Sequence, residues 1–225
     1  MNRNAHIDGH SPMQSSIDRE KEAVAEAGAA LVCEGMRVGL GTGSTVARLL
    51  PRLADRKLKD VAYVATSPET EQAALELGLD VRPFAAFARL DLALDSADQV
   101  ALSGWLVKGG GGAHTREKVV TAAADRFVVI VSSNKLVAAL AAPIPLELLA
   151  FGLASTLRLL APTALRSTPP TPDGGVLADY LGPVGDPDQL AATLSQAPGV
   201  VGHGLFPPQL TNEILVATGP SVRRL

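Results

Sequence analysis

Apolar and polar residues follow two periods along the first 140 residues, one typical of helices and one typical of buried strands. Apolar positions at intervals of three and four residues predict amphipathic helices, and short uninterrupted apolar runs predict strands buried on both faces. Helices are expected at residues 16–33, 46–53, 69–77 and 115–126, and strands at 37–40, 61–65, 79–82, 90–94 and 127–131. Because strands alternate with helices, the pattern predicts a parallel sheet covered on both faces.

The pattern changes at Pro143 and Pro145, after which strands and helices no longer alternate regularly. Helices are expected around residues 152–160 and 187–196, strands near 163–167 and 176–180, and a final strand at 214–217 that returns to the first sheet. We therefore expect an α/β fold with two domains. A mostly parallel sheet domain takes residues 1–142 with 206–225, its polar residues 1–15 being a disordered tail, and a smaller α+β domain takes residues 143–205.

Composition and charge exclude several classes of protein. The chain has 225 residues, 47% of them hydrophobic, which is ample for a buried core. With a net charge of -3 and scattered lysines and arginines, neither nucleic acid nor a membrane surface is an expected partner. The single cysteine, Cys33, and the absence of an apolar leader favour the cytoplasm. Four histidines and one cysteine offer no metal-ligand spacing, so neither a metal ion nor another cofactor is expected.

A run of four glycines between Lys108 and Glu117 is the strongest indication of a ligand site. Glycines cost backbone entropy on folding and bury no side chain, so four in succession indicate that a ligand lies against the backbone. The run precedes the helix expected at 115–126, where free N–H groups and the helix dipole favour an anion. The alternative is a flexible linker followed by an ordinary glutamate near a helix start. His114, a lone histidine at that start, is expected to be a capping or solvent residue.

A second candidate loop, Gly-Thr-Gly-Ser-Thr at residues 41–45, joins an expected strand to an expected helix. It matches neither the dinucleotide fingerprint nor the P-loop, so it suits one phosphate and a few sugar hydroxyls, unless it is an ordinary connection. Asp95 and Asp98 follow the strand at 90–94, at the sheet edge where ligands gather. They are candidate metal ligands, turn residues or partners for substrate hydroxyls.

Glu117 is the candidate general base. A carboxylate beside a glycine-lined pocket can have its pKa raised by desolvation and can take a proton from a carbon next to a carbonyl. Lys108 and the glycine N–H groups would then stabilise the enediolate oxygen that forms.

These motifs and their order resemble the A-type ribose-5-phosphate isomerases. The resemblance runs from about residue 18 to 217, and its segments are residues 41–45, 66–71, 95–98 and 108–118 together with Lys135. The family interconverts D-ribose 5-phosphate and D-ribulose 5-phosphate in the non-oxidative branch of the pentose phosphate pathway. The resemblance therefore implies an isomerase that needs no metal or organic cofactor, a Rossmann-like domain with a small α+β domain, and a homodimer or tetramer.

The resemblance also implies roles for individual residues. Glu117 would be the proton acceptor, Asp95 or Asp98 would assist ring opening, and Lys108 would hold the enediolate. The pentose phosphate would be bound by Thr42, Gly43, Ser44, Thr45, Ser96, Ala97, Gly109, Gly110, Gly111, Lys135 and, less specifically, Lys21.

Three departures from the family pattern leave alternatives open. Ser96 and Gln99 replace a glycine and an acid of the family, Ser132 replaces another acid, and residues 173–175 are a shortened form of a family motif. If Ser96 requires positive φ, its turn is strained by about 1 kcal/mol. A catalytically silent sugar-phosphate sensor is one alternative, and a related lactonase or amino-sugar deaminase is another.

Overall fold

The computed structural model describes residues 12–225, so the first eleven residues of the expected tail lie outside the described part. Helix α1 spans Pro12–Ala29. It therefore begins before residue 16, where we expected the helix to start, and residues 12–15 belong to the helix rather than to the tail. In the described part no helix combines the length and apolar character needed to cross a membrane.

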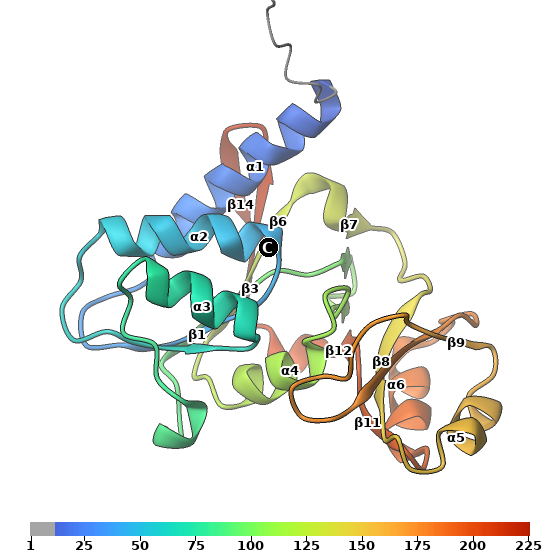
Figure 1. The fold of residues 1–225 in the computed structure, drawn as a ribbon. Coiled ribbons are helices and arrows are strands. Elements are labelled where there is room, and N and C mark those ends of the chain that lie inside the picture. Colours follow the sequence, from blue (N-terminus) through green and yellow to red (C-terminus); the bar gives the residue numbers. More distant parts are fainter. Residues whose placement is uncertain (1–11) are drawn as a thin grey trace, which may run out of the picture.

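A six-stranded sheet forms the centre of the larger unit (Figure 1). Its order is β14-β13-β6-β3-β1-β2, and all neighbours are parallel except β13 and β14. The strands are β1 Arg37–Leu40, β2 Ala62–Ala65, β3 Leu92–Asp95, β6 Phe127–Ser132, β13 Glu213–Thr218 and β14 Ser221–Arg224. The strand expected at 79–82 is wrong, because only Val81 bridges to Tyr63. Pro83, which has no N–H, ends that pairing at once.

Helices cover both faces of this sheet, as the alternation predicted. On one face α1, α2 (Ser44–Asp55) and α3 (Pro68–Glu76) share a core with strand residues such as Leu94. On the other face α4 (His114–Ala122) packs Val120 against Ala93 and its neighbours. Successive residues of β3 thus enter opposite cores, which explains why the strand is apolar throughout.

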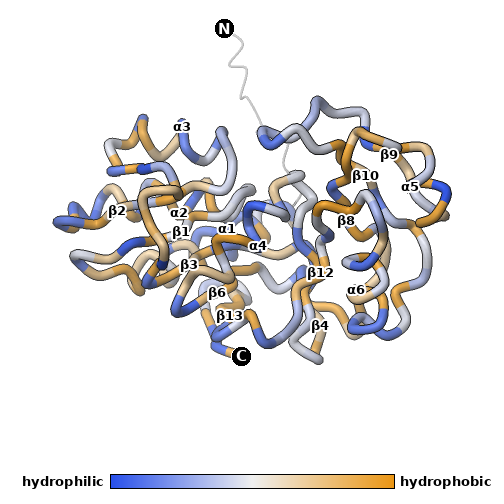
Figure 2. The backbone as a smooth tube through the Cα atoms, turned by 90° about the horizontal axis from the view of Figure 1, so that it is seen from below, coloured by the Kyte–Doolittle hydropathy of each residue, from blue (hydrophilic) through white to orange (hydrophobic). Residues whose placement is uncertain are grey.

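A smaller antiparallel sheet, with two helices, forms the second unit (Figure 2). Its strands are β11 Val200–His203, β8 Ile144–Leu148, β10 Val176–Tyr180 and β9 Thr163–Leu165 in spatial order, and its helices are α5 Leu153–Leu159 and α6 Pro187–Gln196. The unit has its own apolar core. The expected α/β class with a smaller α+β unit is confirmed, while the domain boundaries at residues 142 and 205 stay a prediction.

A third sheet of very short strands lies beside α4 and was not predicted. Its order is β12 Leu205–Phe206, β5 Leu106–Val107, β4 Gln99–Ala101 and β7 Leu136–Val137. Because β12 pairs with β5, it brings Phe206 next to the segment that leads into the glycine run.

Candidate active site

The candidate site lies at the carboxyl ends of β1 and β3, where the strand order reverses. Strand β1 has β2 on one side and β3 on the other, so the chain leaves β1 in one direction and returns on the opposite side. Such a switch point leaves a crevice between the two loops. Gly41 follows β1 there, and a Cβ atom on it would lie 1.8 Å from the Asp95 carboxyl carbon. Only glycine therefore permits the two loops to pack this closely.

The 41–45 loop presents the N-terminus of α2 to this crevice. Gly43 is the N-cap, with φ 119°, and supplies no side-chain cap, so the first N–H groups of α2 stay available to a ligand. Hydrogen bonds to the segment after β2 hold the loop in place. Thr70 Oγ1 donates to Gly41 O at 3.0 Å, and the Thr42 and Thr66 hydroxyls lie 2.9 Å apart. Ser44 is exposed, whereas its neighbour Thr45 is buried.

Asp95, Lys108 and Glu117 form a buried triad, each no more than 3% exposed. Lys108 Nζ donates to Asp95 Oδ2 at 2.7 Å and to the Ser96 carbonyl. It also forms an ion pair with Glu117 Oε2 at 3.3 Å. Asp95 Oδ1 accepts from the backbone N–H groups of Thr42 and Ser96 at 3.2 and 2.7 Å. One buried cation thus stands between two buried carboxylates.

This burial sets the electrostatics of the triad. The pKa of Glu117 is raised to about 8, chiefly by desolvation and then by the negative charge of Asp95, while Lys108 acts to lower it. Burial alone would lower the pKa of Lys108, but the charges of Asp95 and Glu117 raise it above its usual value. Burial raises the pKa of Asp95 as well, although Lys108 and two backbone amides act to lower it. Lys108 therefore stays cationic, and Glu117, with a pKa of about 8, can gain or lose a proton near neutral pH.

The glycine run follows Lys108 directly, and three of its four glycines, Gly109, Gly110 and Gly112, have neighbours too close for a Cβ atom. Gly109 and Gly112 have φ of +93° and +83°, conformations that other residues rarely adopt. Gly110 N donates to Asp98 Oδ2 at 2.7 Å, so the half-buried Asp98 contacts the run directly. A Cβ atom on Gly109 would lie 2.5 Å from His114 Cβ. The linker alternative is therefore wrong, because Gly109, Gly110 and Gly112 are packed against other parts of the fold.

His114 is not the capping or solvent residue that we expected. It is fully buried beneath Gly109, and the N-cap of α4 is Ala113. Burial, and after it the positive charge of Lys118, lowers the pKa of His114 to about 3. Neither ring nitrogen has a hydrogen-bond partner of ordinary geometry among the described residues, although the Gly202 backbone acts to raise the pKa. His114 is thus neutral at physiological pH and supports the run by packing.

The two outer lysines lie at the rim. Lys135 ends a short 3₁₀ turn (Ser133–Lys135) directly after β6, on the same edge of the sheet. Lys21 on α1 is 3.9 Å from Asp18, which pairs with Arg48 at 2.7 Å, and Arg48 donates to Ser44 O at 3.0 Å. Lys21 therefore lies close to the start of α2. Among the described residues, neither lysine has a contact with the buried triad.

The departures from the family pattern lie outside the triad. Ser96 does not have positive φ, so the expected strain does not arise. The Gln99 side chain exchanges two hydrogen bonds with the Ala141 backbone, at 2.7 and 2.9 Å. Ser132 donates to Asn134 Oδ1 at 2.6 Å. The Ala97 side chain is buried in the core, which leaves its backbone to contact a ligand.

Sequence reasoning missed Arg166, which reaches the site from the second unit. Its guanidinium donates to the carbonyl oxygens of Gly109 and Gly110 at 3.0 and 3.1 Å. Leu177 also packs on the run, since a Cβ atom on Gly112 would lie 2.5 Å from its Cδ1. Nothing local in the sequence indicates either contact, because both residues are more than fifty positions from the run.

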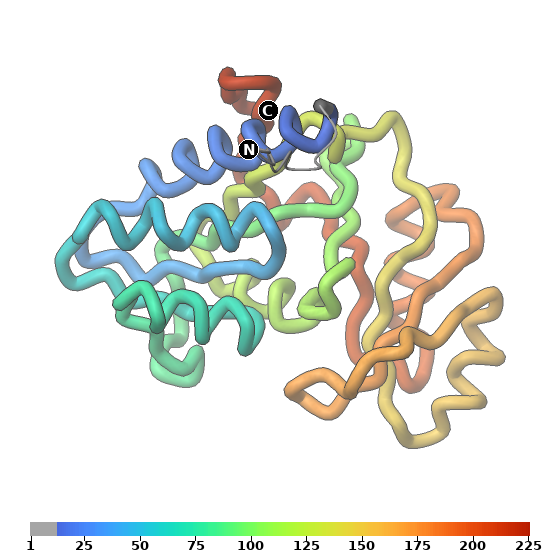
Figure 3. The backbone as a smooth tube through the Cα atoms, turned by 45° about the horizontal axis from the view of Figure 1, so that its top comes forward, coloured from blue at the N-terminus to red at the C-terminus, as the bar shows by residue number. Residues whose placement is uncertain are grey.

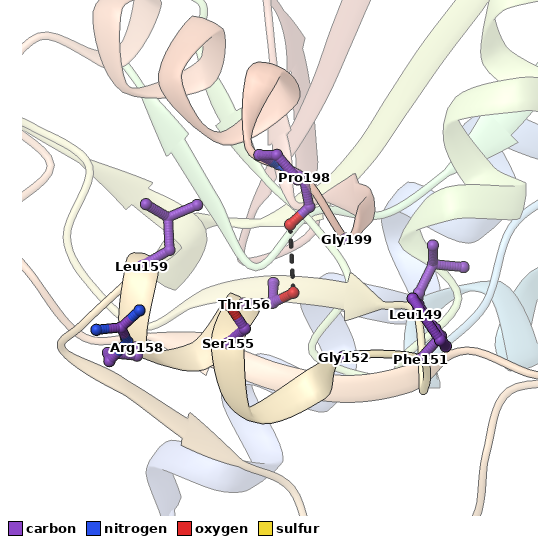
Figure 4. Close-up of a pocket in the computed structure, with 9 residues that line it drawn as sticks. All are labelled: Leu149, Phe151, Gly152, Ser155, Thr156, Arg158, Leu159, Pro198 and Gly199. Carbon is purple, nitrogen blue, oxygen red and sulfur yellow. Dashed lines mark hydrogen bonds between the residues drawn. The ribbon is translucent and has the colours of Figure 1, made fainter.

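Two cavities help to locate the ligand. One of about 470 Å³ lies between residues 111–113 of the run and the 168–173 loop of the second unit. Another, of about 710 Å³, lies within the second unit beside the exposed Phe151, where Thr156 Oγ1 donates to Pro198 O at 3.2 Å (Figure 4). Among the predicted site residues, Gly111 lines the first cavity and none lines the second. The first cavity therefore adjoins the candidate site. In the described part no group of three or more His, Cys, Asp or Glu side chains could hold a metal ion.

The chain is similar to known proteins in sequence and in structure. A family model described as ribose 5-phosphate isomerase A (phosphoriboisomerase A) matches residues 62–220. The ribose-5-phosphate isomerase A of Gluconobacter oxydans is 39% identical over 224 residues, covering 92% of this chain and 96% of that protein. The solved ribose 5-phosphate isomerase A of Methanocaldococcus jannaschii is 32% identical with a TM-score of 0.87, covering 93% and 99% of the two chains. A D-ribose-5-phosphate isomerase in complex with phospho-erythronic acid is 27% identical with a TM-score of 0.88, covering 93% and 98%.

Proposed function

The chain belongs to the ribose 5-phosphate isomerase A family, and we propose that it interconverts D-ribose 5-phosphate and D-ribulose 5-phosphate with Glu117 as the proton acceptor. The observation that carries this proposal is the position of Glu117, 3% exposed and 3.3 Å from the buried ammonium group of Lys108. A carboxyl group whose pKa is raised to about 8 is a stronger base than an exposed one, yet part of it is ionised at neutral pH.

The proposed reaction moves one proton between neighbouring carbons. Glu117 takes the proton from C2 of the open-chain aldose, and the C–H electron pair forms the C1–C2 double bond of an enediolate. The same carboxyl group then returns the proton to C1, while the hydroxyl proton passes from O2 to O1. Lys108 and the N–H groups of the glycine run stabilise the negative oxygen, which is the term that most lowers such barriers.

Substrate binding is assigned to the more exposed half of the site. The phosphate lies at the N-terminus of α2, near Ser44 and Thr45, because unpaired N–H groups and the helix dipole favour an anion there. Lys21 and Lys135 supply further positive charge at the rim. The backbone of residues 95–98 and of 109–111 contacts the sugar.

Asp98 is better placed than Asp95 to assist ring opening. Both oxygens of Asp95 already accept hydrogen bonds, from Lys108 and from two backbone amides. Asp98 accepts one, from Gly110 N, and is half-buried. An Asp98→Asn variant should therefore lose turnover on the cyclic sugar but keep its solvent exchange with an open-chain sugar phosphate. Equal losses with both substrates would contradict this assignment.

The direct test is an assay of the purified protein with D-ribose 5-phosphate in the presence of a chelator. We expect the same equilibrium mixture from either pentose phosphate, at a rate that the chelator does not change. Binding of phospho-erythronic acid without turnover would instead favour the silent sensor. Conversion only of a sugar lactone or an amino-sugar phosphate would favour the other enzymes, although no contact in the site favours any of these alternatives.

We also propose that the protein acts in the cytoplasm as a homodimer or homotetramer. A patch of exposed apolar side chains supports an oligomer, since Leu149, Phe151 and Leu159, which line one cavity of the second unit, are 51%, 92% and 62% exposed. Light scattering coupled to gel filtration measures the mass directly, and a single species of 23.2 kDa would contradict the proposal.

A further inference from the structure

Arg166 is the side chain through which the second unit forms hydrogen bonds with the glycine run. The 166–175 segment between β9 and β10 extends from that unit toward α4 (Figures 1 and 3). Nε and Nη2 of Arg166 donate to the two oxygens of Asp179 at 2.9 and 2.7 Å. Its Nη1 donates to the carbonyl oxygens of Gly109 and Gly110. Both side chains of the ion pair are largely buried, 15% and 21% exposed.

Holding a carbonyl group also orients the amide on the other side of the same planar peptide. The Gly109 carbonyl shares its peptide with the Gly110 N–H, which donates to Asp98 Oδ2 at 2.7 Å. Arg166 and Asp98 therefore hold this peptide from its two ends. The Gly110 carbonyl shares its peptide with the Gly111 N–H, which has no acceptor among the described residues. Arg166 thus directs the Gly111 N–H away from itself.

We propose that Arg166 is a positioning residue for the isomerisation: anchored by Asp179, it orients the Gly109 and Gly110 carbonyls so that the Gly111 N–H points at the enediolate oxygen. The inference rests on the proposed function, because that reaction develops an oxyanion beside the run. Glycine peptides turn readily, so the run by itself would not hold its amides in one direction. A donor stabilises an oxyanion best when its orientation is fixed before the reaction.

The planar fork of arginine is essential to this arrangement. One edge of the guanidinium binds the Asp179 carboxylate, and the remaining nitrogen bridges two carbonyl oxygens. Lysine carries the same charge but presents a single ammonium group, which cannot hold both partners in this geometry. We therefore expect Arg166→Lys to remove the positioning while it keeps the charge.

A matched control is available in Arg37, which forks the Asp91 carboxylate through Nε and Nη2 at 3.1 and 3.0 Å. That pair lies at the amino ends of β1 and β3, the opposite edge of the sheet from Asp95. Arg37→Lys should lower the melting temperature slightly and leave turnover within twofold of the parent. Arg166→Lys should lower kcat by roughly 10- to 100-fold with KM changed less than threefold. It should also weaken binding of phospho-erythronic acid by about tenfold, because its carboxylate places negative charge where the enediolate oxygen would lie.

Asp179→Asn supplies a second variant that keeps Arg166 itself. It should show part of the same kcat loss. The double variant should be no slower than Arg166→Lys alone, because both changes disrupt the same ion pair between Arg166 and Asp179. Partial recovery of kcat in Arg166→Ala on addition of ethylguanidinium, but not of ethylammonium, would support the assignment further. Turnover of Arg166→Lys within twofold of Arg37→Lys, at equal loss of melting temperature, would overturn it. Inactivity of the parent protein would instead contradict the proposed function, and phospho-erythronic acid binding would then still test the role of Arg166.

Discussion

Two buried glutamates of this protein, Glu20 and Glu117, lie in opposite surroundings. Glu20 on α1 is 6% exposed and accepts hydrogen bonds from Ser133 N, Ser133 Oγ and Gly219 N at 2.9, 2.8 and 3.0 Å. Burial acts to raise the pKa of Glu20, but these donors lower it below its usual value. Glu117 has the ammonium group of Lys108 beside Oε2 but, among the described residues, no backbone donor, and burial followed by the charge of Asp95 raises its pKa to about 8.

The comparison shows that burial alone does not make a base. At Glu20 the hydrogen-bond donors outweigh burial, so this carboxylate stays ionised and joins α1 to the ends of β6 and β13. Where such donors are missing, the carboxyl group binds a proton more tightly and can act on a substrate. Substitutions at the two positions test this division between a structural and a chemical glutamate.

The largest expected effect is that of Glu117→Gln, which keeps the size of the side chain and removes its basicity. We expect kcat to fall on the order of 10³-fold while KM changes only a few-fold. Steady-state kinetics and a titration with phospho-erythronic acid measure the two effects. Turnover within tenfold of the parent would remove Glu117 from its role.

Lys108→Met should have the next largest effect, because it leaves two buried carboxylates without their cation. Removing one partner of a buried ion pair costs about 3–5 kcal/mol of unfolding free energy, and turnover should fall by roughly 100-fold or more. Urea denaturation and kinetics at matched pH test both. A variant as stable as the parent would show that Lys108 does not compensate the charges of Asp95 and Glu117.

Glu20→Gln is the matched control for Glu117→Gln. It should lower the unfolding free energy by about 1–3 kcal/mol, because charge-assisted hydrogen bonds are weakened, and leave kcat within twofold. A loss of turnover comparable to that of Glu117→Gln would mean that the two glutamates are not functionally distinct.

The two variants should also differ in the sign of their pH dependence. The folded pKa of Glu117 is raised from about 4.5 to about 8, so its contribution to stability is present below the lower value and is lost as pH rises through about 8. The folded pKa of Glu20 is lowered, so its contribution is present above about 4.5 and is lost in acid. Relative to the parent, Glu117→Gln should therefore gain stability between pH 5 and 9, and Glu20→Gln should regain it toward pH 3. Denaturation curves across this range would contradict the account if the stability of both variants, relative to the parent, changed in the same direction as pH rises.

The smallest effect is expected from restoring the family residues with Ser96→Gly, Gln99→Glu and Ser132→Asp. None of the three side chains contacts the buried triad, and Ser96 has no unfavourable φ to relieve. Each change should alter kcat less than about threefold, since substitutions away from special features have small effects. A gain of a hundredfold or more would revive the silent-sensor alternative.

The sequence predicted the parts of this molecule that leave a periodic or compositional signal. The alternation of helices and apolar runs predicted the parallel sheet, which is confirmed, and the glycine run with Glu117 indicated the candidate site, whose residue roles stay a prediction. The sheet formed by β4, β5, β7 and β12 was missed because strands of two or three residues show no periodicity. His114 was misjudged because a histidine at a helix start has the same local sequence whether it is buried or exposed. Arg166 was missed because its partners are distant in sequence and meet it only through the packing of the second unit.

The central claim is that Glu117 carries the proton between C1 and C2, and it can be tested by following deuterium in D₂O. Glu117 exchanges its proton with solvent, so the parent protein should place solvent deuterium at C1 of ribulose 5-phosphate, with kcat/KM rising as pH increases through about 8. Glu117→Gln should place none while still binding phospho-erythronic acid. Deuterium incorporation by that variant at a rate near that of the parent would contradict the account.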